Sequence, residues 1–309
     1  MHGTALFLSL LLLGCGAGSG DASRARERAA DPPPARVHWY ASGEAGIFAN
    51  AYLIEGPDGV VAIDATLTVA TAGELRGRLD RLGKPLRAVL LTHGHPDHYN
   101  GAAILTRGDR SIPIVATAGV DKVIRAHDAA KEAQWRPVFG DQWPRERRLP
   151  DRTAADGEVV RFAGLELEVR DLGPGESHHD SIWLLRTGDG RAHAFVGDLL
   201  FHGVHSYTAD GHTGAWLANL DRLEREWPDV VLHPGHGASP APRDLIARQR
   251  RYLDAYRRAV ARLARGGALD EEAERELTRE MTAQLGSDRL AFLVGLGADA
   301  VAAELAAVP

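Results

Sequence analysis

The sequence predicts an α/β (α+β) domain in which two β-sheets lie between helices. Two observations lead to this fold class. Short strand-like segments gather in two β-rich halves of the chain, and helical segments are mixed among them and follow them. A chain of 309 residues is long enough for one large domain of this kind. We expect two sheets sandwiched between helices and not a single parallel sheet.

The first β-rich half contains a hairpin and two further strands. Gly56-Pro57-Asp58-Gly59 is a strong turn signal between two apolar runs, and Gly83-Lys84-Pro85 ends a helical segment. Strands are expected at residues 37–40, 50–55, 60–64, 86–91 and 112–116, and helices at 68–82, from about 97, and up to about 131.

The second half begins after an irregular insertion at residues 132–156, a kind of segment that often overhangs a site. The helices after residue 242 hold no cluster of catalytic residue types, so they are expected to pack on the domain or to form an oligomer contact. Strands are expected at 158–162, 165–171, 181–186, 192–197 and 230–232, and helices at 213–226, 243–265, 270–285 and 288–305.

The N-terminus looks like an export signal. Residues 1–14 are apolar but too short to span a bilayer as a mature helix, and Leu12-Leu13-Gly14-Cys15 resembles a bacterial lipobox. Residues 15–35 have the composition of a flexible linker. We therefore expect an exported protein, periplasmic or anchored to the membrane by a lipid on Cys15; a plain secretory signal or a misassigned start codon is the alternative.

The predicted organisation is thus a signal peptide at 1–14, a linker at 15–35, a main domain at 36–240 and a helical extension at 241–309. Cys15 is the single cysteine, which excludes an intrachain disulfide. The net charge is −6, and the charges are interspersed, so nothing indicates a nucleic-acid partner. A small-molecule substrate is expected, and the oligomeric state is not indicated.

The most informative segment is the loop that follows the predicted strand at 86–91. It places His93, His95, Asp97 and His98 within six positions. In a fold with alternating strands and helices, ligand sites usually lie at the C-terminal ends of strands. Imidazole and carboxylate groups together bind zinc and similar divalent metals. The alternative is a polar loop that is rich in histidine by chance.

Three other segments complete a pattern that resembles the metallo-β-lactamase superfamily of metallohydrolases. Residues 173–180 lie between two predicted strands, Gly197-Asp198 ends an apolar strand, and Pro234-Gly235-His236-Gly237 ends the last strand. Together with His-x-His-x-Asp-His, these motifs occur in the family's order over residues 36–240. The resemblance implies an αββα sandwich with metals at one edge of the sheets, closer to glyoxalase II than to a true β-lactamase.

The resemblance also implies two divalent metal ions, zinc above all. It assigns His93 and His95 to the first ion, Asp97, His98 and His236 to the second, Asp198 to a bridge between the two, and Asp64 to a supporting position near the metal loop.

One expected ligand of the first ion is in question. The family usually has a histidine in a segment like Gly-His-Thr-x-x-Asp, where this chain has Glu176. Glutamate is a sound zinc ligand and would make the site more anionic, which favours iron or manganese more than three imidazoles would. The alternatives are that His178 or His179 reaches the metal after a shift of the loop, or that none of the three does.

Other side chains have weaker assignments. His202, His205 and Tyr207 are possible substrate contacts or structural residues, and His212 shares this ambiguity. The remaining residues of interest are expected to be structural or ordinary: His38, His127, His193 and His233, with Trp135 and Trp143 in the core unless they line a pocket.

The resemblance implies hydrolysis of an ester, thioester, lactone or phosphoester. Two ions that share Asp198 would lower the pKa of a bridging water and hold a hydroxide, and Asp97 could relay a proton. The chain lacks a Gly-x-Ser-x-Gly nucleophile elbow. A β-lactamase, which often has cysteine at the bridging position, a di-iron oxidoreductase and a non-catalytic metal-binding envelope lipoprotein are the alternatives.

Overall fold

The computed structural model describes residues 35–265 and 267–307. The predicted signal peptide, the lipid anchor on Cys15 and the linker lie outside these residues, apart from Ala35. Of the helices in the described ranges, none is both long and apolar enough to cross a membrane.

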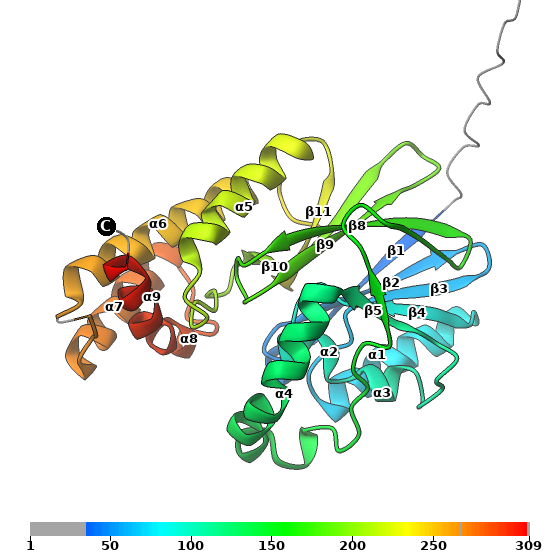
Figure 1. Ribbon diagram of the computed structural model, residues 1–309, viewed down its shortest axis with the longest axis horizontal. Helices are drawn as coiled ribbons and strands as arrows, with labels where there is room; N and C mark the ends of the chain where they lie inside the picture. Colours follow the sequence, from blue (N-terminus) through cyan, green and yellow to red (C-terminus); the bar gives the residue numbers. More distant parts are fainter. Residues whose placement is uncertain (1–34, 266, 308–309) are drawn as a thin grey trace, which may run out of the picture. The chain divides into compact units, whose positions relative to one another are not determined.

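The first sheet has six strands in the order β1-β2-β3-β4-β5-β6 (Figure 1). The first three pair antiparallel, and β3 to β6 pair parallel. The strands are β1 (Arg36–Ala41), β2 (Asn50–Gly56), β3 (Gly59–Ile63), β4 (Leu86–Leu90), β5 (Ile114–Thr117) and β6 (Arg152–Ala154).

The second sheet has five strands in the order β11-β10-β9-β8-β7. All its pairs are antiparallel except β10 with β11, which is parallel. The strands are β7 (Val159–Phe162), β8 (Leu165–Gly173), β9 (Asp180–Arg186), β10 (Ala192–His202) and β11 (Val231–Gly237).

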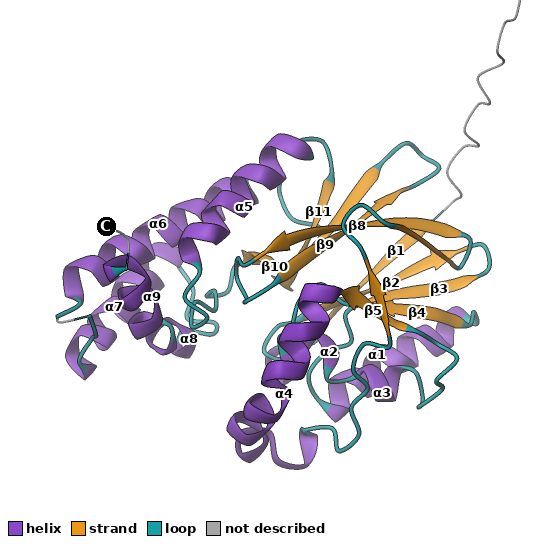
Figure 2. Ribbon diagram, in the orientation of Figure 1, coloured by secondary structure: helices purple, strands orange, loops and turns teal. Residues whose placement is uncertain are grey.

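Helices cover the outer faces of both sheets (Figure 2). The first group packs on the first sheet: α1 (Val69–Leu82), α2 (Pro96–Tyr99), α3 (Ala102–Leu105) and α4 (Ala118–Phe139). The second group begins with α5 (Thr213–Glu226) and α6 (Leu245–Leu263), which contact β10 of the second sheet. It continues with α7 (Glu271–Leu285), α8 (Phe292–Leu296) and α9 (Ala298–Ala306), which pack on α6 and on one another. The predicted αββα sandwich is therefore confirmed.

The alternation of side chains along the strands explains these layers. In β3, Val61 and Ile63 point into the core between the sheets, whereas Val60 and Ala62 belong to the core under the first group of helices. Because successive side chains of a strand point to opposite faces, an entirely apolar strand predicts burial on both faces. The C-terminal helices share one core with β10, in which α6 contacts the strand and α7 and α9 pack on α6.

The boundaries differ from prediction in several places, among them β10, which continues to His202 although the strand was expected to end at residue 197. Helix α4 continues to Phe139, well into the segment expected to be irregular. Pro137 lies in its last turn and cannot donate a helical hydrogen bond, and the helix ends two residues later. Strand β6 was not expected because its short polar segment has no apolar alternation. Strand β11 extends through His236, and Gly297 separates α8 from α9.

Direct hydrogen bonds join the two sheets at the edge where the histidine loop lies. The backbone N–H of Ser181 in β9 donates to the carbonyl of Thr92 at 2.8 Å. The indole N–H of Trp183 donates to the carbonyl of Leu91 at 2.9 Å. The hydroxyl of Tyr52 donates to the carbonyl of Pro234 at 2.6 Å. These bonds fix the end of β4 against the second sheet.

Candidate metal centre

The histidine loop leaves the C-terminal end of β4 and turns at once into α2. His95 precedes this helix and Pro96 begins it, a favoured position because its ring fixes a helical φ and its missing N–H is not needed there. The side chains of His93, His95, Asp97 and His98 are all buried. The loop therefore brings its polar groups into the protein, which rules out the alternative of a solvated polar loop.

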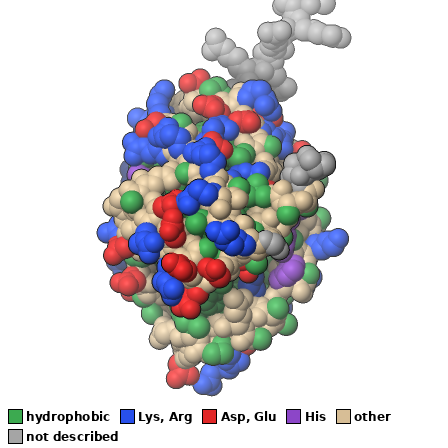
Figure 3. Space-filling model, turned by 90° about the vertical axis from the view of Figure 1, so that its left-hand side faces the viewer, with side chains coloured by type: hydrophobic (Ala, Val, Ile, Leu, Met, Phe, Trp, Pro, Cys, Tyr) green, Lys and Arg blue, Asp and Glu red, His purple; other side chains and the backbone are tan. Residues whose placement is uncertain are grey.

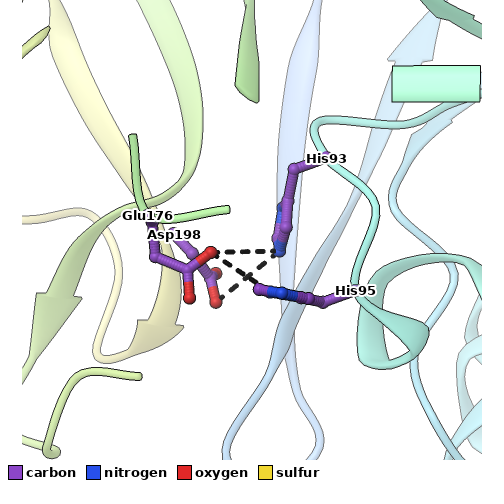
Figure 4. A group of neighbouring side chains, drawn as sticks. All are labelled: His93, His95, Glu176 and Asp198. Carbon is purple, nitrogen blue, oxygen red and sulfur yellow. Dashed lines mark ion pairs between the residues drawn. The ribbon is translucent and has the colours of Figure 1, made fainter. Parts of the chain in front are cut away.

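Four side chains form a first donor group, which we define as His93, His95, Glu176 and Asp198 (Figure 4). The two imidazoles come from the loop after β4 and face the two carboxylates from the second sheet. Nδ1 of His95 lies 3.1 Å from Oε2 of Glu176. Nε2 of His93 lies 3.8 Å from Oε2 of Glu176 and 3.8 Å from Oδ2 of Asp198.

A second donor group consists of Asp97, His98, Asp198 and His236. Nε2 of His236, which comes from β11, lies 3.1 Å from Oδ2 of Asp97 and 3.1 Å from Oδ2 of Asp198. Nε2 of His98 lies 3.2 Å from Oδ1 of Asp198. Asp198 thus belongs to both groups, and in each group the four donor atoms lie within 4.8 Å of one another.

Buried atoms without partners show that a cation fits this site. Among the described residues, Nε2 of His93, both carboxylate oxygens of Glu176 and Oδ1 of Asp198 are buried and accept or donate no hydrogen bond. Leaving such polar atoms unpaired costs free energy, and most of all for charged groups. Imidazole nitrogens and carboxylate oxygens that converge in this way are donors for divalent metals.

The ring nitrogens that face away from the centre are held by hydrogen bonds. Nδ1 of His98 donates to Oδ2 of Asp64 at 2.8 Å, and Nδ1 of His236 donates to the carbonyl of Ile47 at 2.9 Å. Nδ1 of His93 donates to the hydroxyl of Thr92 at 3.0 Å, and that hydroxyl donates to Asp64 at 2.9 Å. Such bonds fix the tautomer and orient the ring of a metal-binding histidine. Asp64 occupies the supporting position that the resemblance implies.

His95 is held by Asp210, a residue that the sequence analysis missed. Nε2 of His95 donates to Oδ2 of Asp210 at 3.2 Å, so Nδ1 remains for the centre. The ring of Tyr207 packs edge-on against His95 with centroids 4.9 Å apart. Asp210 lies in the turn Ala209-Asp210-Gly211, which resembles any surface turn in sequence and gives no signal of its role.

The pKa values reflect the close approach of imidazoles and carboxylates. Burial alone would lower the pKa of His95, but the charges of Glu176 and Asp210 outweigh it and raise the pKa to about 10. In the same way Asp198 overcomes burial and raises the pKa of His236 to about 9. Burial alone would raise the pKa of Asp97, but the nearby His98 and His236 hold this pKa well below its usual range. The imidazole donors therefore carry protons in the metal-free protein, and these protons would be released when a metal binds.

Glu176 is held in place by the loop around it. The side chain of Asp180 accepts hydrogen bonds from the backbone N–H of Ser177 at 3.2 Å and from its hydroxyl at 2.8 Å. These bonds close the turn that carries Glu176, which is 1% exposed. Burial raises the pKa of Glu176. An uncompensated buried carboxylate of this kind favours a nearby cation.

The two alternative ligands point elsewhere. Nδ1 of His178 lies 2.8 Å from Nε2 of His212, and Nε2 of His179 donates to Asp171 at 2.6 Å. Neither belongs to a donor group, whereas Glu176 does. In the described residues, the loop that carries His178 and His179 is not shifted toward the centre, and Glu176 occupies the position of the third ligand.

Glycine at position 235 lets β11 approach Asp198. A Cβ atom there would lie 1.9 Å from Oδ1 of Asp198, which is far inside contact distance. The glycine in Pro234-Gly235-His236 is therefore required for His236 and Asp198 to share one centre.

Four of the donors, His95, Asp97, Asp198 and His236, line the floor of a cavity of about 440 Å³. Of the three possible substrate contacts, only Tyr207 lines it. His205 is fully buried and bonded to Tyr252 and to the carbonyl of Ser287, and His202 bonds to the carbonyl of Ala238. His202 and His205 therefore do not reach the cavity.

One other assignment changes. Trp135 lines the cavity, contrary to the expected core position, because α4 extends past it; Trp143 is buried as expected. The ring of His127 lies 4.9 Å from that of His178, and neither residue belongs to a donor group. His233 is buried, stacks on Phe195 and is structural. His193 bonds to His233, and His38 to Glu55.

The sequence match decides the family. The model of the metallo-beta-lactamase superfamily matches residues 45–236, well over half of the chain. The chain belongs to the metallo-beta-lactamase superfamily. The match ends at His236, the last member of the second donor group, and spans both sheets.

Curated relatives within the superfamily are hydroxyacylglutathione hydrolases. The enzyme of Neisseria meningitidis serogroup C is 27% identical over 157 residues, which are 51% of this chain and 51% of the relative. That of a Synechococcus species is 29% identical over 184 residues, 58% of this chain and 60% of the relative. The chain thus spans between about half and three fifths of these relatives.

Solved structures agree in fold. A beta-lactamase domain protein from Burkholderia ambifaria has a TM-score of 0.58 at 20% identity, covering 83% of this chain and 80% of that one. A metallo-beta-lactamase family protein from Thermus thermophilus has a TM-score of 0.57 at 24% identity, covering 81% and 86%. Both show the same fold.

Proposed function

We propose that this protein is a metal-dependent hydrolase that holds two divalent ions and cleaves an ester, a thioester or a lactone. One observation carries the proposal: two donor groups share Asp198 and open onto one cavity. A purely structural metal site would be closed and would need no second ion.

The ions would be held by the two donor groups, and when bound they would supply Lewis-acid polarisation of the substrate and activation of water. Other side chains of the protein would orient the metal-binding histidines. Asp64 and Asp210 fix the rings of His98 and His95. Asp97 lines the cavity as a member of the second donor group, so it would lie beside the activated water and would relay a proton.

We further propose that the bond cleaved is an acyl bond. The curated relatives are named as hydrolases of hydroxyacylglutathione. The bridging position is Asp198, where true β-lactamases often have cysteine, and this argues against a β-lactamase. We propose zinc as the metal, with iron or manganese as the alternative that the carboxylate of Glu176 favours.

The test begins with metal analysis of the purified full chain, followed by a panel of nitrocefin, an acyl thioester, a lactone and bis-nitrophenyl phosphate. We expect two ions per chain and turnover of the thioester or the lactone. A chelator should abolish this turnover. The Asp198→Asn variant should lose both. A metal-loaded, folded protein that is inactive on the whole panel would contradict the proposal, and turnover of nitrocefin or the phosphodiester alone would overturn the acyl assignment.

We also propose that the protein is exported and carries a lipid on Cys15, on the support of the lipobox-like sequence alone. Labelled palmitate should enter the wild-type chain and not the Cys15→Ser variant. Equal labelling of both, or of neither, would contradict this.

A further inference from the structure

We infer that the substrate is an uncharged acyl ester, thioester or lactone that carries an apolar chain, and that this chain lies between α4 and α8. The inference rests on the proposed hydrolytic function and names its substrate class. It sets the protein apart from a hydrolase of an acidic glutathione conjugate.

The walls of the cavity differ from its floor. The polar donors His95, Asp97, Asp198 and His236 are at the floor, and Tyr207 and Lys131 are the other polar side chains that line it. The rest of the lining is apolar: Ile47, Leu67, Trp135, Val138, Phe139, Phe201, Phe292 and Leu293, with Pro96 at the start of α2. A pocket that is mostly apolar with a few convergent polar groups is typical of a small-molecule site.

Two elements that are distant in sequence supply the outer walls. Helix α4 contributes Trp135, Val138 and Phe139, and α8 contributes Phe292 and Leu293. Figure 1 shows α4 in green and α8 in red on either side of the end of β10. Val138 is 68% exposed and Phe292 is 57% exposed, so both remain in contact with water in the free protein.

Exposed apolar side chains that converge on one cavity indicate binding. Single exposed apolar residues are normal, but a contiguous group around a pocket marks an interaction site. On the face shown in Figure 3, acidic and basic side chains are interspersed. An apolar chain that covers Val138 and Phe292 would remove their surface from water, which stabilises the complex.

Charge argues against an acidic substrate. Among the described residues, Lys131 is the single Lys or Arg that lines the cavity, and its Nζ already lies 3.1 Å from the hydroxyl of Tyr207 and 5.1 Å from the ring centroid. Glutathione conjugates carry carboxylates and peptide groups. Against these apolar walls such groups would lose water without gaining partners.

The size of the cavity permits a chain of medium length. A volume of about 440 Å³ lies within the range of roughly 300–1,000 Å³ of small-molecule pockets. Each buried methylene should raise kcat/KM by about fourfold if it is fully removed from water. Partial exposure at Val138 and Phe292 reduces this, so we expect at least about tenfold between a four-carbon and an eight-carbon chain.

The experiment uses the metal-loaded full chain and two series of esters. In one series, p-nitrophenyl acetate, butyrate and octanoate lengthen the acyl side; in the other, ethyl, butyl and octyl thioacetate lengthen the leaving side. A rise of about tenfold or more in one series supports the inference and identifies the side. Flat series, or a preference for S-lactoylglutathione, would overturn it.

Charge is tested by a matched substrate. The p-nitrophenyl monoester of suberic acid has the eight-carbon chain of the octanoate but ends in a carboxylate. It should be hydrolysed at least about tenfold less efficiently than the octanoate, because the charged end would enter the apolar walls. Equal efficiency would contradict an apolar site.

Helix α8 offers a matched pair of variants. Phe292 lines the cavity, whereas Leu296 lies one turn further along the same helix, is 43% exposed and does not line it. Phe292→Ala should lower the ratio of octanoate to acetate hydrolysis about tenfold, the loss expected for a few buried methylenes. Leu296→Ala should leave the ratio unchanged. An equal effect of both variants would overturn the role of this wall.

A binding measurement separates this inference from the proposed hydrolysis. The neutral dye N-phenyl-1-naphthylamine should fluoresce on the wild type, be displaced by 2-decanone and not by butanone, and bind weakly to Phe292→Asp. If these results hold while no ester is hydrolysed, hydrolysis fails and the apolar site stands. If short esters are hydrolysed but the dye does not bind, the apolar site fails and hydrolysis stands.

Discussion

The two donor groups are alike in composition but differ in how they are supported. Each has two imidazoles, one carboxylate of its own and a share of Asp198. The family pattern has three imidazoles in the first group; Glu176, which the sequence places at the third position, makes the two groups equal in charge. The difference between the groups therefore lies in the residues behind the donors.

Asp64 and Asp210 show this difference. Asp64 supports the second group directly through His98 and the first group indirectly through Thr92 and His93. Asp210 contacts His95 of the first group alone. The second group should thus depend on one carboxylate, and the first on two.

The largest effect is expected where the groups coincide. Asp198→Ala removes a donor from both, so both ions should be lost. Loss of a residue behind a ligand typically costs roughly 10–100-fold in metal affinity or activity. Loss of the shared donor should exceed the upper end of that range in kcat/KM. Metal content by mass spectrometry and kinetics on the same sample would check this. Retention of either ion at full occupancy would show that the groups do not share Asp198.

A change at Glu176 should separate the groups. Glu176→Ala removes a donor from the first group only, so one ion per chain should be lost and the other retained. Glu176→His restores the imidazole of the family pattern and should raise the ratio of zinc to iron or manganese in the isolated protein, because imidazole is a softer ligand than carboxylate. Metal analysis of both variants provides the measurement. If the Glu176→Ala variant still binds two ions per chain, Glu176 is not a metal ligand.

Loss of a supporting carboxylate should weaken the binding of each metal ion whose histidine ligands it holds. Asp64→Asn should weaken both ions, and Asp210→Asn the first ion only, each by about 10–100-fold. Calorimetric titration of the metal-free protein resolves the two steps. The control is His202→Ala, whose side chain bonds to the carbonyl of Ala238 and belongs to neither donor group. Equal weakening of both steps by Asp210→Asn would contradict the asymmetry.

The smallest effect concerns the loop that carries Glu176. Asp171 raises the pKa of His179 above 6.5 through their hydrogen bond. The stabilisation is therefore fully present below pH 6.5 and is lost as the pH rises through the higher folded-state pKa. The pair is half exposed, so His179→Ala should lower the free energy of unfolding by less than about 1 kcal/mol at pH 5.5, and by less still at pH 9. Urea unfolding at both values, with Asp171→Asn as control, tests the sign; a larger loss at pH 9 would refute it.

The parts of the site that were predicted from sequence are those that short motifs contain. The loop from His93 to His98 keeps its donors within six residues, and Asp198 and His236 each follow an apolar run. The order of strands and helices predicted two sheets between helices, and the resemblance added the αββα arrangement. The motifs showed which residues could be donors, and the resemblance supplied their roles.

The parts that were missed depend on contacts between distant segments. Asp210 meets His95 across 115 positions in the chain. Phe292 and Val138 meet at the cavity although each is merely an apolar residue on a helix, which predicts a core contact as readily as a pocket. The carboxyl-terminal helices were read as packing elements because they hold no polar cluster, yet α8 forms a wall.

The position of Asp198 and His236 on the second sheet, opposite a loop from the first, has a consequence for folding. Each donor group takes two donors from the loop after β4 and the other two from the second half of the domain, so a complete group forms only when both sheets have docked. An ion that binds the folded state alone adds to the stability of the fold by an amount that grows with the logarithm of its concentration over Kd. A bound ion would therefore act as a reversible cross-link between the two halves of the domain, and its strength would depend on the concentration of free metal.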